Sequence, residues 1–168
     1  MRRGIIPTMG SMLTGAVVAW LAATHDGVAS SVDERAAIVA LNRTITEAIE
    51  RRDVDAVMAG YVDSTDITFF EDTMPFELRG RRSIRKYIED LLASGSFHDR
   101  FESGSVLISG DLAAGHYTLV VKWTDKSGTH TERGRYTQIL KKTNGKWRIW
   151  HEHFSVPYDP ATGKAVLD

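Results

Sequence analysis

The run WRIWHEHFSVP, near the end of the chain, places two histidines on either side of a glutamate. Imidazoles have a pKa near neutrality, so closely spaced histidines are candidates for acid–base chemistry. Side chains alternate along a strand, which puts His151 and His153 on one face and Glu152 on the other. The histidine face begins with Trp147 and Ile149 and becomes polar along its length. This pattern predicts a strand that runs from a packed core into a cavity.

A His-x-His pair on one strand face, joined by a third histidine, also resembles a three-histidine metal site. No second feature of the sequence indicates a metal, and we expect neither a metal nor a cofactor. The chain has no cysteine, which excludes disulfides and thiolate chemistry.

Long strands must position these histidines. After Gly95 the hydrophobic pattern changes to a period of two, with turn signals SGD, DKSG and TNG between the runs. We therefore expect four strands joined by hairpins, over residues 97–109, 112–124, 129–142 and 146–155.

Helices precede these strands. Apolar residues three to four apart, from Ile38 to Ile49, predict an amphipathic helix, and Asp53 can cap a short second helix. DITFFED reads as a strand, and RRSIRKYIEDLLASG as a third helix that ends at Gly95. The order predicts an α+β fold in which a curved, antiparallel (mixed) sheet wraps around three N-terminal helices.

Composition limits the class of protein. The chain has 168 residues, 42% of them hydrophobic, and a net charge of −1. This is enough for one globular domain with a sizeable core. The balanced charge gives no electrostatic reason to expect a nucleic-acid partner.

The first thirty residues differ from the rest. Arg2 and Arg3 precede an uncharged apolar run, SMLTGAVVAWLAA, and the small residues of VAS follow. This pattern is typical of a secretory signal, and the apolar run is too short for a comfortable membrane span. We expect residues 1–30 to be a cleaved signal peptide and residues 31–168 to form a single periplasmic or secreted domain. No membrane association is expected after cleavage.

The element order and the ending GKWRIWHEHFSVPYDPATGKAVLD resemble the SnoaL-like branch of the nuclear-transport-factor-2-like superfamily, which includes ketosteroid isomerases and polyketide cyclases. The resemblance covers roughly residues 33–168. It implies a cone-shaped fold with a deep, mostly apolar cavity, usually in a homodimer. It does not fix a reaction, because this fold hosts isomerases, hydratases, cyclases, hydrolases and non-catalytic binders.

Individual residues follow from the resemblance. TFFED, then a turn and R-G before a helix, is similar to the isomerase segment that carries the catalytic aspartate. Asp72 is the best match and Glu71 the one-residue alternative. A histidine on the middle strand and an arginine on the penultimate strand recur in SnoaL-like relatives, and His116 and Arg135 match them.

Two departures from the isomerase pattern mean that the steroid isomerase mechanism is not supported. The isomerase uses a tyrosine on its first helix, and no tyrosine occurs between residues 31 and 52. Its second oxyanion donor, a protonated aspartate, falls near Thr137 here.

These observations predict a site at the mouth of the cone. Asp72 would act as the base and three histidines would carry protons: His116, His151 and His153. Arginine can hold an anionic ligand or stabilise an enolate-like oxygen. The predicted ligand contacts are Arg135, Thr137, Tyr61, Phe69 and Trp123.

The expected function is acid–base chemistry of isomerase, dehydratase or cyclase type on a largely apolar ligand with a polar end. The alternative is a non-catalytic periplasmic binding or interaction module, in which the polar residues form a structural cluster.

Overall fold

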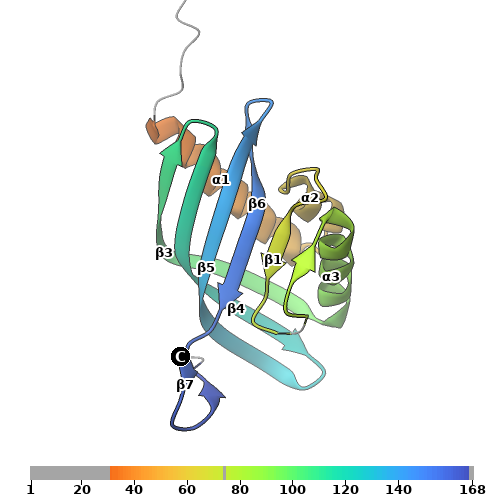
Figure 1. Ribbon diagram of the computed structural model, residues 1–168. Coiled ribbons are helices and arrows are strands. Elements are labelled where there is room, and N and C mark those ends of the chain that lie inside the picture. Colours follow the sequence, from red (N-terminus) through yellow and green to blue (C-terminus); the bar gives the residue numbers. More distant parts are fainter. Residues whose placement is uncertain (1–30, 74, 167–168) are drawn as a thin grey trace, which may run out of the picture.

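The computed structural model describes residues 31–73 and 75–166 (Figure 1). The predicted signal peptide, residues 1–30, lies outside the described residues. Within the described part of the chain, no helix is long and apolar enough to span a membrane.

Three helices form in the predicted order: α1 (Ser31–Glu50), α2 (Val54–Ala59) and α3 (Arg81–Ser94). The Asp53 side chain caps α2 by accepting a hydrogen bond from the backbone N–H of Ala56 at 3.0 Å. Helix α3 buries one face, formed by residues four apart in the sequence: Ile84, Ile88 and Leu92. Figure 1 shows α1 running along one face of the sheet, with α3 next to β1 and β2.

The main sheet has six strands: β1 (Thr68–Phe70), β2 (Leu78–Arg79), β3 (Ser96–Ser109), β4 (Leu112–Asp125), β5 (Gly128–Thr143) and β6 (Lys146–Ser155). Their order is β2-β1-β6-β5-β4-β3, and all neighbours are antiparallel except β1 and β6. The sheet is curved and open rather than a closed barrel (Figure 1). Two short strands, β7 (Tyr158–Asp159) and β8 (Lys164–Ala165), form a separate ribbon. The predicted α+β fold class and the mixed sheet are confirmed.

A bulge interrupts the pairing of β5 with β6. Ile139 pairs with His151, whereas the adjacent Leu140 pairs with Ile149, which leaves Trp150 as an extra residue. An extra residue changes the alternation of side chains, so the residues beyond it exchange faces. Ile149 is therefore buried before the bulge, and Glu152 is buried after it.

Candidate functional site

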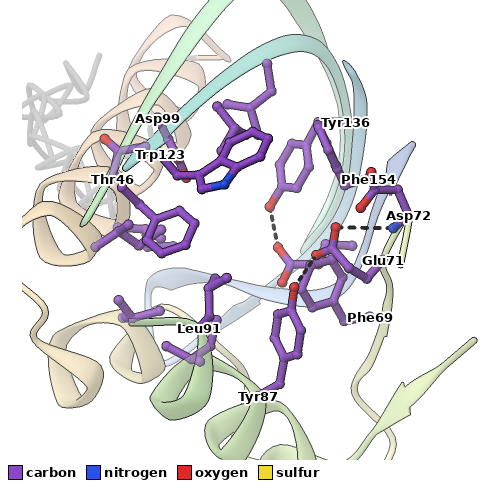
Figure 2. Close-up of a pocket in the computed structure, with 18 of the residues that line it drawn as sticks. Thr46, Phe69, Glu71, Asp72, Tyr87, Leu91, Asp99, Trp123, Tyr136 and Phe154 are labelled. Carbon is purple, nitrogen blue, oxygen red and sulfur yellow. Dashed lines mark hydrogen bonds between the residues drawn. The ribbon is translucent and has the colours of Figure 1, made fainter. Parts of the chain in front are cut away.

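A cavity of about 320 Å³ lies between the helices and the inner face of the sheet (Figure 2). Its apolar wall comes from α1, α2, α3 and the long strands, and eight aromatic residues contribute to it: Tyr61, Phe69, Tyr87, Phe97, Phe101, Trp123, Tyr136 and Phe154. A mostly apolar, concave space with a few polar groups is the usual form of a small-molecule site.

The charged groups of this wall are all carboxyls: Glu71, Asp72, Asp99, Asp125, Glu132 and Glu152. Among the described residues that line the cavity there is no lysine, arginine or histidine. Burial disfavours the ionised form of a carboxyl, and it raises the pKa of four of them: Glu71, Asp99, Glu132 and Glu152.

Glu71 stands directly after β1, where the chain leaves the sheet. Its carboxyl accepts hydrogen bonds from the Tyr87 hydroxyl at 3.0 Å and from the Asp72 backbone N–H at 3.2 Å. Burial, together with the neighbouring Asp72 side chain, raises the pKa of Glu71 to about 8, while the Tyr87 hydrogen bond opposes the shift. A carboxyl with this pKa can both accept and return a proton near neutral pH.

Glu152 is the second unusual carboxyl and is only 3% exposed. The hydroxyls of Tyr61 and Tyr136 each donate to one of its two oxygens. Behind them, the Gln138 amide donates to the Tyr136 hydroxyl and to Asn42, both at 3.0 Å. Burial raises the pKa of Glu152 to about 7, and the two tyrosine hydrogen bonds oppose that rise.

Four of the predicted site residues line the cavity: Asp72, Tyr61, Phe69 and Trp123. Asp72 is exposed, whereas Glu71, the alternative at this position, is half-buried and hydrogen-bonded. The burial and the hydrogen bond therefore favour Glu71 over Asp72 as the acid–base carboxyl.

Five predicted site residues lie on the outer face of the sheet: His116, Arg135, Thr137, His151 and His153. None of them lines the cavity, so their expected position is wrong. The physical reason is the bulge at Trp150. A strict alternation counted from Trp147 puts His151 and His153 on the inner face, but the extra residue at the bulge turns them to the outer face. Glu152, which the sequence pattern placed outside, points inward instead.

These residues nevertheless lie near one another, as predicted, but on the outer face of the sheet. Thr137 pairs with His116 on one side and with His153 on the other. His151 Nδ1 lies 2.7 Å from the Thr68 hydroxyl, and the Phe70 ring meets both β6 histidines edge-on. Within the described part of the chain, no group of three or more histidine and acidic side chains is arranged to hold a metal ion.

Sequence reasoning missed Glu132, Tyr136, Gln138 and Glu152 as cavity residues. The composition of β5 carries a signal for three of them. Its odd-numbered positions include Arg133, Arg135 and Lys141, which favour solvent, so the even-numbered positions are the buried set.

Residues 38–159 match the family of SnoaL-like domains. The chain belongs to this family. No curated protein matches the chain significantly.

Solved structures agree with the SnoaL-like assignment at the level of fold. A nuclear-transport-factor-2-like protein of unknown function from Pseudomonas putida KT2440 is 26% identical, with a TM-score of 0.72 over 82% of this chain and 96% of that one. A nuclear transport factor 2-like superfamily protein from Salmonella enterica is 17% identical, with a TM-score of 0.71 over 82% of this chain and 100% of that one. A ketosteroid isomerase-like protein from Erwinia carotovora atroseptica is 20% identical, with a TM-score of 0.62 over 73% of this chain and 95% of that one.

Proposed function

We propose that this SnoaL-like protein binds a small, largely apolar molecule in the cavity and transfers a proton on it, with Glu71 as the acid–base group. The observation that carries this proposal is a carboxyl with a pKa of about 8 in the wall of an apolar cavity. Such a group is ionised often enough to remove a proton and protonated often enough to give one back. Reactions of isomerase or dehydratase type need both steps.

A ketone with an acidic C–H tests this proposal without knowledge of the natural substrate. In D2O, the full chain should accelerate hydrogen–deuterium exchange at the carbon next to the carbonyl of 2-tetralone, a bicyclic apolar ketone. Proton NMR follows the exchange. The rate should rise with pH through about 8, because only ionised Glu71 accepts a proton.

The variant Glu71→Gln should lose roughly two to four orders of magnitude of this rate, or fall to the rate in buffer. Asp72→Asn should have a smaller effect, because Asp72 is exposed. Glu89→Gln, on the outer side of α3, is the matched control and should behave like the original chain. A reversed order, with Asp72→Asn inactive and Glu71→Gln active, would assign the base to Asp72.

Ligand binding without chemistry is the second candidate function. It is favoured by Glu152, whose oxygens are both engaged by tyrosine hydroxyls in a buried network. Groups satisfied in this way can serve the architecture alone. Binding of an apolar probe with no acceleration of exchange would support this candidate and contradict the catalytic one.

The export predicted from the N-terminal sequence remains part of the proposal. Its support is the change of composition near Ser30. N-terminal sequencing of the protein recovered from periplasm or medium tests it, and a chain that begins at Met1 in the cytosol would contradict it.

A further inference from the structure

The described residues that line the cavity include acidic side chains and no basic ones, although the charge of the chain as a whole is balanced. The sequence has 21 Lys and Arg residues and 22 Asp and Glu residues. Six of the acidic residues line the cavity, and no basic side chain does so in the described part of the chain. A cleft lined by groups that ionise to one sign of charge attracts the opposite sign. The cavity is therefore complementary to a cation and hostile to an anion.

Two of these carboxyls lie in one row across the sheet. Asp99 on β3 pairs with Val121 on β4, and Val121 pairs on its other side with Glu132 on β5. Neighbouring strands are about 4.8 Å apart, so the backbones of Asp99 and Glu132 are separated by about 10 Å, with an apolar side chain between them. A single cationic group above Val121 can contact a carboxyl from each side.

Aromatic rings surround this row. Along β3, Phe97 and Phe101 are the next inner residues on either side of Asp99, and Phe97 pairs with Trp123. Figure 2 shows Asp99 beside Trp123, on the opposite side of the cavity from Glu71. Aromatic faces attract ammonium groups through their quadrupole, and a nearby carboxylate adds charge attraction.

Two buried acceptors in the wall lack partners. Oδ1 of Asp99 and Oε1 of Gln138 are shielded from solvent and accept no hydrogen bond from any described residue. Gln138 itself is 1% exposed. Buried polar atoms are normally satisfied, so unfilled acceptors that line a cavity indicate a ligand that donates hydrogen bonds. The hydroxyls of Tyr61 and Tyr136 cannot serve, because both donate to Glu152.

We propose that the ligand is an apolar organic amine whose protonated nitrogen contacts Asp99 and Glu132, while its apolar body extends along the aromatic wall towards Tyr136 and Glu71. This inference rests on the proposed function of the cavity as a ligand site. It does not require Glu71 to act as a base.

The ionisation of the two carboxyls is consistent with this arrangement. Burial raises the pKa of Asp99 to about 6. The charge of His98 opposes this rise, and the charge of Glu50 contributes to it. Burial, together with the charges of Asp72 and Asp99, raises the pKa of Glu132 to about 7. A bound cation favours the ionised forms, so amine binding should release protons and should be tighter at pH 8 than at pH 6.

Three naphthalene probes that differ only in their polar end test the inference. They are 2-naphthylmethylamine, which is cationic, 2-naphthylmethanol, which is neutral, and 2-naphthoate, which is anionic. Quenching of tryptophan fluorescence in the full chain reports binding, since Trp123 lines the cavity. The amine should bind at least tenfold more tightly than the alcohol, and the carboxylate more weakly than both.

Two variants locate the cationic end of the ligand. Asp99→Asn and Glu132→Gln keep the side-chain size and remove the charge, and each should weaken amine binding by about tenfold while leaving alcohol binding within about twofold. Asp90→Asn, an exposed position on α3, is the matched control and should change neither. Having two variants in different strands keeps the test valid if one of them fails to fold.

The outcomes separate this inference from the proposed function. Equal binding of the amine and the alcohol would overturn the amine inference and leave the cavity as a ligand site. Binding of none of the three probes would overturn both. Amine-selective binding without exchange of 2-tetralone would support the amine inference and reject the catalytic function.

Discussion

Glu71 and Glu152 are two glutamates in one cavity with different surroundings. Glu71 is half-buried, has one tyrosine partner and has a pKa near 8. Glu152 is fully enclosed, has two tyrosine partners and has a pKa near 7. Two donors favour the ionised carboxylate, which explains why deeper burial does not give Glu152 the higher pKa. Of the two, Glu71 has the geometry of a group that can meet a ligand.

The hydrogen bond from the Tyr87 hydroxyl lowers the pKa of Glu71, so removal of this hydroxyl should raise that pKa. Tyr87→Phe keeps the ring, which packs edge-on against Phe69 with centroids 5.6 Å apart, and deletes the hydroxyl that donates to Glu71. The lost hydrogen bond favoured ionised Glu71, so its pKa should rise above about 8. The midpoint of the pH–rate profile for 2-tetralone exchange should move up by roughly half a unit to one unit. A midpoint that stays or falls would contradict this role of Tyr87.

At the scale of elements, the sequence predicted the helices and strands well because their signals are local. The four long strands and three helices appear close to their predicted bounds, since period-two runs, turn dipeptides and helix caps act over a few residues. The face that carries His116 on β4, Arg135 and Thr137 on β5, and His151 and His153 on β6 was not predicted correctly. That property depends on pairing across the sheet, where one extra residue at Trp150 reverses the assignment.

The same error extended over several strands because the strands were aligned with one another correctly. Thr137 does pair with His116 and His153, so choosing the wrong face for β6 placed the β4 and β5 residues on the wrong face too. Asp72, Tyr61, Phe69 and Trp123 were placed in the cavity independently of β6, and they do line it. When a candidate site depends on which face of the sheet a side chain occupies, the face must be established for each strand separately.

At the scale of the whole molecule, the buried carboxyls should make the protein less stable as pH rises. The pKa of Glu152 is raised by burial from its ordinary value of 4.5 to about 7, so the folded state binds a proton that the unfolded state releases. The stabilisation is complete below about pH 4.5 and is lost as pH rises through about 7. Glu71, Glu132 and Asp99 shift in the same direction, while the lowered pKa of His151 opposes them.

Urea unfolding should therefore give a lower free energy of unfolding at pH 8 than at pH 5, with Glu152 contributing about 3 kcal/mol of the difference. Glu152→Gln should reduce the difference by that amount, and Glu89→Gln should not change it. A free energy of unfolding that is constant or rises between pH 5 and pH 8 would contradict the burial of protonated Glu152.

Self-association is the other prediction for the whole molecule. The outer face of the sheet leaves Phe70, Ile139 and Trp150 between 36% and 39% exposed, which a second copy would cover. We expect a homodimer through this face, and light scattering of the purified domain at micromolar concentration should give twice the mass of the chain. Ile139→Glu should give a folded monomer. A monomer without any substitution would contradict the prediction.

The extra residue at Trp150 has a consequence for how such a protein can diversify. Deleting a single codon there would restore the uninterrupted alternation of β6 and turn His151 and His153 towards the cavity, with Glu152 facing outward. No side chain would be replaced, yet the strand would present imidazoles where it now presents a carboxyl. Insertions and deletions in this strand therefore change the chemistry of the cavity in one step. Homologues with nearly identical sequences through this segment can differ in the ligands they accept.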